Sequence, residues 1–505
     1  MKKLWIILLS TLGGLFVIFI SIPFFLSSDI VKDILIKSAE KQMSANLSAE
    51  ELDISWFGPQ KLSKIIYQDK TSKIYIDTLS TNMSFFSFAK TLSNNSFLTS
   101  TSKTEIKNIT ILMQTPYKED IKFTNVYLTI DSKGADYPLK ITSYGKTIDN
   151  NIEGNFDINI EISKKIPTKK DLAKSVFDIA IKCENFPVAG LDKLLNISKP
   201  ENYGIITQIL GPKMNCEINT KVSNGTGPLK LHLSAVNLNA FLDCTFTNTQ
   251  IKLNRPFETN FILTEELFRY IFKDKKTLFS GMQSLRPIRI KISDNDFYMP
   301  IEPFNLKALH ISHATVNLGL LHIYDEGRIS KMIDITKDQN YRKTNESTVW
   351  FTEGDVAIKN GYLYVGRVDA LINYAFQVCF WGNVNLMTNY VNMILGLPAF
   401  TLSNAFKITD LSEDYVLMMD MKGPFNNVQI DKQSAAIQIG SMLAAQATKG
   451  TKGELFGNIL GMLGKYSDDQ SQVPSAKKPF PWDKYIKKPE SDKQSKDFNI
   501  FDLFN

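Results

Sequence analysis

Cysteine and histidine are both scarce in this chain of 505 residues, which contains four of each. So few cysteines exclude a disulfide-dense scaffold, and so few histidines leave little room for a histidine-rich metal site. A charge excess is also lacking, because 58 Lys and Arg residues face 52 Asp and Glu residues for a net charge of +6. Over this length that excess indicates no nucleic-acid partner. The 43% of hydrophobic residues excludes wholesale disorder and a polytopic membrane protein.

Catalytic motifs are missing as well. The chain has no P-loop, no G-x-S-x-G elbow and no H-E-x-x-H helix. His310 and His313 are three apart in a β context and so point to opposite faces, which makes a shared metal ion difficult. Asp294 and Asp296 flank Asn295, a spacing typical of a solvated turn. The sequence therefore predicts no enzyme, no cofactor and no metal ion.

Only one long apolar run is present, from Leu4 to Leu26, with no charge between Lys3 and Asp29. A bilayer core requires about 20 apolar residues, and this run meets that length. It ends in bulky residues, which favours an anchor over a cleaved signal, although Ser27 leaves a weak cleavage site. We therefore expect a transmembrane helix over residues 1–28. The N-terminal lysines predict a cytoplasmic N-terminus and a body on the other side of the membrane.

The four cysteines would then meet an oxidising compartment. None belongs to a C-x-x-C pair, so a disulfide and isolated buried thiols both remain open. They are Cys183, Cys216, Cys244 and Cys379.

Beyond an expected short helix over residues 29–43, the dominant period from about Leu52 is two. The clearest example is Ile152–Ser163, where isoleucines fall on one face and acidic or amide residues on the other. A helix would scatter those isoleucines around its circumference, whereas a strand places them on one side. The same alternation recurs through Asp431, between joints rich in Asn, Gly and Ser. We expect an elongated β domain over residues 29–431.

The pattern changes again after Asp431. Residues 432–447 are rich in alanine and aliphatic residues and predict a helix, and Gly453, Gly457 and Gly461 then recur every fourth residue. We expect C-terminal helices over residues 432–464 and, because the composition turns polar and proline-rich, a disordered tail over 465–505. The glycine spacing permits either close helix packing or a flexible linker.

On the order of 20–25 strands would carry one long apolar face. Such a face cannot stay in water, and few helices are predicted to cover it. A sandwich, a closed barrel and an open trough all fit the alternation. We expect a mainly β chain whose long, twisted antiparallel sheet curls into a groove. The candidate lipid-groove residues are apolar strand positions: Phe156, Ile158, Ile160, Ile179, Ile181, Leu231, Ile288 and Ile290.

Several segments resemble the AsmA-like proteins of Gram-negative envelopes, which are relatives of the TamB and YhdP bridge-like proteins. The resembling segments are Leu52–Gln60 and Ile74–Leu79 after the N-terminal helices, and Asn360–Leu363, Trp381–Leu386 and Gly423–Asp431 near the C-terminus. Val428 stands where the closing pattern commonly has a proline. The resemblance implies a periplasmic β structure anchored in the inner membrane, with a hydrophobic groove linked to phospholipid movement or outer-membrane homeostasis.

We therefore expect a protein that binds or transfers phospholipid acyl chains. Its partners would be phospholipid or another acyl lipid, the inner membrane, and the outer membrane or envelope proteins. The alternative is an envelope scaffold or outer-membrane assembly factor with a packed β-sandwich and protein partners. A weaker third option, an envelope enzyme, predicts a pocket with perturbed carboxylates.

Overall fold

The computed structural model describes residues 25–43, 45–69, 72–93, 101–114, 120–134, 138–149, 151–163, 176–195, 203–271, 281–295, 297–301, 306–324, 346–409, 411–425, 427–448 and 472–484. The chain divides into two compact units, Met1–Asn248 and Thr249–Asn505, which we call unit 1 and unit 2. The described residues contain 26 strands with few helices, and the strands pair antiparallel without closing into a ring. The prediction of a mainly β chain with a large antiparallel sheet is confirmed.

The predicted membrane topology is wrong. Among the described residues, no helix combines the length and the apolar character needed to cross a bilayer. The first long helix, α2 (Asp29–Met43), carries charged residues from its first turn onward, and Lys32 bonds to Asp29 at 2.6 Å. This finding overturns a single-pass inner-membrane protein with a cytoplasmic N-terminus and a periplasmic body. Residues 1–24 of the expected anchor lie outside the described residues.

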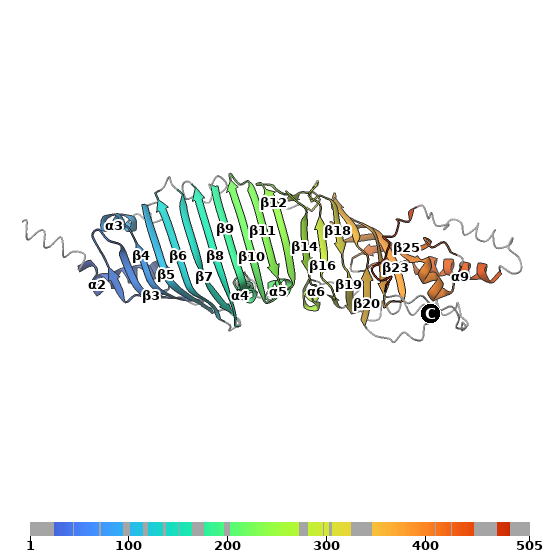
Figure 1. Ribbon diagram of the computed structural model, residues 1–505, viewed down its shortest axis with the longest axis horizontal. Helices are drawn as coiled ribbons and strands as arrows, with labels where there is room; N and C mark the ends of the chain where they lie inside the picture. The colour runs from blue at the N-terminus through green and yellow to red at the C-terminus, as the bar shows by residue number, and fades with distance from the viewer. Residues whose placement is uncertain are drawn as a thin grey trace, which may run out of the picture. The chain divides into compact units, whose positions relative to one another are not determined.

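Unit 1 is an antiparallel meander in which, from β3 onward, each strand pairs with the next one along the chain (Figure 1). The short strands β1 and β2 pair with opposite halves of β3, and β3–β12 then follow in order. Besides α2, its elements are β1 (Asn46–Ser48), β2 (Glu51–Asp53), β3 (Gln60–Gln68), β4 (Ser72–Thr81), α3 (Phe85–Ser93), β5 (Thr101–Gln114), β6 (Asp120–Lys133), β7 (Leu139–Asp149), β8 (Ile152–Ser163), β9 (Val176–Pro187), α4 (Val188–Leu195), α5 (Ile205–Leu210), β10 (Lys213–Ser223), β11 (Gly227–Ala235) and β12 (Leu238–Phe246).

Alternation of side chains determines the two faces of this sheet. On β10, the polar residues Glu217, Asn219 and Lys221 are exposed, whereas Cys216 and Ile218 on the other face are partly exposed. The strand predicted over Ile152–Ser163 is β8, with the same bounds. Period two therefore produces one polar and one apolar face, as expected for a strand.

A line of left-handed residues crosses the first strands of unit 1. Lys64 on β3, Asn108 on β5 and Asn125 on β6 have φ values near +50°. Asn108 lies opposite Asp77 of β4 and donates its side-chain amide to that carboxylate at 3.0 Å. Bulges of this kind bend a strand and increase its twist.

Unit 2 has interrupted strands. Its elements are β13 (Gln250–Leu253), β14 (Phe257–Phe261), α6 (Glu265–Ile271), β15 (Gly281–Ser284), β16 (Ile288–Ile292), β17 (Met299–Pro300), β18 (Ile311–Asn317), β19 (Leu320–Tyr324), β20 (Glu346–Phe351), β21 (Gly354–Lys359), β22 (Tyr362–Ile372), β23 (Phe376–Asn385), β24 (Tyr390–Pro398), α8 (Ala399–Phe406), β25 (Val416–Pro424), β26 (Gln429–Ile430) and α9 (Lys432–Thr448). Short breaks separate β15 from β16, β18 from β19 and β20 from β21. The long strand β22 pairs with both β20 and β21.

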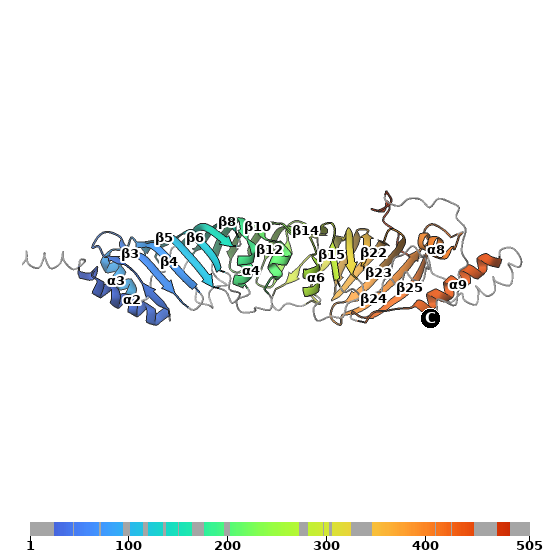
Figure 2. The same cartoon turned by 90° about the horizontal axis from the view of Figure 1, so that it is seen from below.

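The apolar face of unit 2 is closed by its own helices. Leu402 and Phe406 of α8, and Ala435 and Ile439 of α9, are buried in one core cluster with residues from several strands. Figure 2 shows α8 and α9 beside the last strands, and α9 contacts β25. Here the helices supply the cover that the sheet lacks, so unit 2 has a sealed core.

Candidate functional site

One continuous row of side chains crosses the sheet of unit 1. Direct cross-strand partners share one face of a sheet, and the register places one residue from each strand β3–β12 in this line. We call it the apolar row: Leu62, Leu79, Ile106, Leu128, Ser143, Ile158, Ile181, Ile218, Leu231 and Leu242. At about 4.8 Å between strands, it is about 43 Å long.

Every residue of the apolar row is partly exposed, and none is buried. A parallel line beside it has the same character over β6–β11: Ile130, Ile141, Ile160, Ile179, Thr220 and Leu229. These side chains stay partly accessible to solvent although strands flank them on both sides. Unit 1 therefore presents a band of aliphatic surface that is two residues wide.

Two helices, α4 and α5, cover part of this face. The buried residues Phe186, Val188, Leu210 and Met214 form a small core where α4 and α5 meet the ends of β8–β12 (Figure 1). Phe156 packs against this cluster, with its ring edge-on to Phe123 and a centroid distance of 6.1 Å. The small core ends the apolar band on that side.

Buried polar groups hold α4 in place. Lys193 is fully buried, and its Nζ lies 3.2 Å from Oδ1 of Asp149 at the end of β7. Asp192, which precedes Lys193 on α4, accepts hydrogen bonds from the backbone N–H and the hydroxyl of Thr207 at 3.0 and 2.9 Å. Because buried charges are costly without partners, these contacts tie α4 to both the sheet and α5.

The structure separates the candidate groove residues into three groups. Ile158, Ile160, Ile179, Ile181 and Leu231 lie on the open band of unit 1. Phe156 shares the face but belongs to its covered end. The third group, Ile288 and Ile290, lies in unit 2, where Ile288 is 3% exposed and Ile290 packs against the sealed core.

The four cysteines are free thiols. Cys183 and Cys216 are direct partners on β9 and β10, on the same face as the apolar row. Burial, with a smaller contribution from Cys216, raises the pKa of the Cys183 thiol to about 11, and burial raises the pKa of Cys216 as well. Both thiols are protonated at neutral pH and behave as small apolar side chains.

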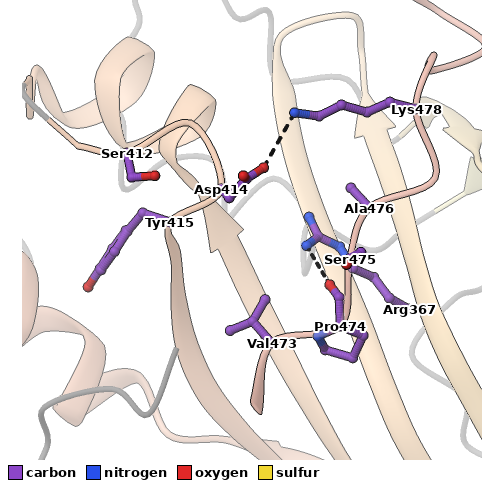
Figure 3. Close-up of a pocket in the computed structure, with 9 residues that line it drawn as sticks. All are labelled: Arg367, Ser412, Asp414, Tyr415, Val473, Pro474, Ser475, Ala476 and Lys478. Atoms are coloured by element: carbon purple, nitrogen blue, oxygen red, sulfur yellow. Dashed lines mark hydrogen bonds and ion pairs between the residues drawn. The ribbon is translucent and has the colours of Figure 1, made fainter. Parts of the chain in front are cut away.

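Unit 2 contains a separate hollow of about 390 Å³ (Figure 3). Arg367 lies at its wall, where the register between β22 and β23 shifts. Its Nε and Nη2 donate to Asp369 at 2.9 and 2.8 Å, and its Nη1 donates to the carbonyl of Pro474 at 2.9 Å. Burial disfavours the charged guanidinium, but the hydrogen bonds to Asp369 together with the electrostatic attraction of Cys379, Asp369 and Asp414 outweigh burial and raise the pKa of Arg367. The guanidinium in the wall of this hollow is thus already paired with Asp369 and with the Pro474 carbonyl.

A larger hollow of about 680 Å³ lies at the start of unit 1. Its wall includes Asp29 and Glu50, which pair with Lys32 and Lys64 at 2.6 Å each. Within the described ranges, no three His, Cys, Asp or Glu side chains gather as a metal ion would require. Neither hollow has the arrangement of a nucleophile, a base and an orienting group.

Comparison of the chain with family models, curated proteins and solved structures gives no match.

Proposed function

We propose that unit 1 binds lipid acyl chains along the apolar row. The observation that carries this proposal is the unbroken line of partly exposed side chains over ten successive strands, aliphatic at every position except Ser143. Exposed apolar surface that is continuous over several strands marks a binding surface for an apolar partner. An extended hydrocarbon chain is narrow enough to follow a band two residues wide.

The hydrophobic effect supplies the affinity. Each methylene removed from water stabilises by about 0.8 kcal/mol. A chain on an open face is covered on one side, so about 14 methylenes would contribute on the order of 6 kcal/mol. That corresponds to a dissociation constant of about 40 µM before association costs. Affinity of this order suits a surface that binds acyl chains reversibly and lets them move along equivalent positions.

The phospholipid or other acyl lipid would keep its headgroup in water at the margin of the band, and no catalytic step is part of the proposal. Kinship with AsmA-like proteins is likewise a proposal, which rests on the resemblance of the sequence segments.

An envelope scaffold with protein partners is the second candidate, because unit 2 has the sealed core that such a role requires. A stoichiometric protein partner without lipid in native mass spectra would favour the scaffold.

Photo-crosslinking tests the acyl-chain proposal directly. The detergent-free full chain is mixed with a fatty acid that carries a diazirine in its hydrocarbon tail, irradiated, and digested for mass spectrometry. We expect adducts on β8–β11 at residues of the apolar face, and we expect excess unlabelled phospholipid to suppress them. Adducts confined to the exposed polar face, or labelling that phospholipid does not reduce, would refute acyl-chain binding by this face.

A further inference from the structure

A short segment near the C-terminus lies on unit 2. Residues 472–484 are described, and Trp482 within them is fully buried. Its indole packs with Trp350 of β20 and Leu371 of β22, which are 3% and 0% exposed. Phe480 stacks on the Trp482 ring with a centroid distance of 4.9 Å. An aromatic pair from the segment therefore fills an apolar slot in the sheet.

The slot lies on the side of the sheet away from the sealed core. Val349 and Ala370, the neighbours of Trp350 and Leu371 along their strands, belong to the sealed core. Adjacent strand residues point to opposite faces, so the slot opens on the other side. Arg286 lies over the Trp350 ring at 4.6 Å and forms part of the same surface. Trp350 and Leu371 are direct partners in the pairing of β20 with β22.

Charge complementarity fixes the rest of the segment. Lys477 pairs with Asp355 of β21 at 2.8 Å, and Lys478 pairs with Asp414 at 3.5 Å. The Arg367 guanidinium donates to the carbonyl of Pro474, as Figure 3 shows. The receiving surface thus offers two carboxylates that pair with lysines, and one guanidinium that donates to a backbone carbonyl, beside an apolar slot.

These contacts have the composition of a peptide complex. A buried aromatic anchor is surrounded by polar contacts at its rim, which is how short peptides are recognised by preformed surfaces. The last described residue before the segment is Thr448 at the end of α9. The anchor, the two lysines and the carbonyl all belong to 13 consecutive described residues, so the recognition elements are contained in one short sequence.

We propose that this surface is a peptide-recognition site that the chain fills with its own residues 472–484. Its ligand class is a basic, proline-containing peptide in which an aromatic residue precedes a tryptophan by two positions. The site accepts the same sequence from another molecule once the chain's own segment is released. The inference is independent of the acyl-chain proposal, because it concerns the other unit and a different surface.

Fluorescence anisotropy with a labelled synthetic peptide of residues 472–484 tests the proposal. The full-length Trp482→Ala variant removes the anchor from the chain's own segment and leaves the receiving surface intact. We expect the peptide to bind this variant about 30-fold more tightly than it binds the wild-type chain, because a buried aromatic anchor is a typical hot spot. The Ser475→Ala chain is the matched control and should behave like wild type, since Ser475 is exposed.

Two results would overturn the proposal. One is equal affinity of the peptide for the wild-type and Trp482→Ala chains, and the other is no binding to a folded Trp482→Ala chain. If that variant does not fold, the Lys477→Glu/Lys478→Glu chain decides, because both lysines lie at the surface. It should bind the wild-type peptide more tightly than the wild-type chain does and reject a peptide with the same two substitutions. Equal binding of both peptides would count against the site.

Discussion

The Ile181→Asp substitution examines the apolar row at its middle. Ile181 has Ile158 and Ile218 as its direct cross-strand partners, so a carboxylate there interrupts the aliphatic surface between them. An acyl chain would lose contact with about four methylenes, or about 1.6 kcal/mol at half coverage, and would partly desolvate the carboxylate. We expect a total loss of about 3 kcal/mol, which is about 100-fold in affinity.

The matched control is Ala180→Asp. Ala180 is the preceding residue on β9 and lies between Asn159 and Asn219 on the polar face. The two variants carry the same change in charge and introduce the same residue of poor strand propensity, so they differ in the face that receives the carboxylate and in the size of the side chain it replaces.

Titration of the full chain with a fluorescent fatty acid measures the affinity, and circular dichroism shows that each variant is folded. We expect Ala180→Asp to bind like the wild-type chain. Equal affinities of the two folded variants, whether both are weakened or both are unchanged, would show that the apolar row does not hold the chain.

Three further predictions concern groups on both units. Lys193→Ala leaves the buried Asp149 carboxylate without its partner and should lower the free energy of unfolding by about 3–5 kcal/mol in urea titrations; a change below 1 kcal/mol would contradict the role given to this pair. Burial raises the pKa of Cys183 to about 11, so alkylation of Cys183 by iodoacetamide should be slow at pH 7 and should accelerate as the pH rises toward 11. A fast reaction of Cys183 at neutral pH would show that its thiol is not buried. Burial opposes ionisation of Asp355, but hydrogen bonding and attraction from Lys477 and His313 outweigh it and lower the pKa of Asp355. The Asp355 carboxylate therefore contributes to docking of residues 472–484 above the ordinary pKa of Asp, about 3.9. That contribution is lost as the pH falls below this value and through the lowered pKa. Tryptophan fluorescence between pH 6 and pH 2 should therefore report release at the acid end in wild type and a smaller pH dependence in Lys477→Ala.

Local sequence was sufficient for the strands and their faces. Period two predicted β8 with its bounds, and the same alternation placed Ile158, Ile179 and Leu231 on an apolar face. The alanine-rich stretch after Asp431 likewise predicted the helix that the structure shows as α9. These features are determined locally, because the periodicity of the backbone decides which side chains share a side.

Local pattern could not distinguish open from covered strands. Ile158 and Ile288 stand in the same alternating context, yet one lies in the open band and the other in a sealed core. The difference arises from α8 and α9, whose buried residues share one core cluster with residues of strands as distant in the sequence as Ile288 of β16. The register that aligns ten residues into one row also depends on pairing between strands and on bulges such as that at Asn108.

The docked residues 472–484 show the same division. Their proline and lysine content favoured a disordered tail over 465–505, and the aromatic pair Phe480 and Trp482 was the only local signal to the contrary. The slot that buries Trp482 is built from β20 and β22, more than a hundred residues earlier in the chain.

By itself, the amino-acid sequence determined that this protein is built of strands with one apolar side, because side-chain alternation is a property of each strand alone. Only the tertiary structure decided which part of that side stays open, which part the helices close and where the C-terminal aromatic pair docks. Those outcomes depend on the free energy of contacts between segments far apart in the chain, and no short window of sequence contains both partners.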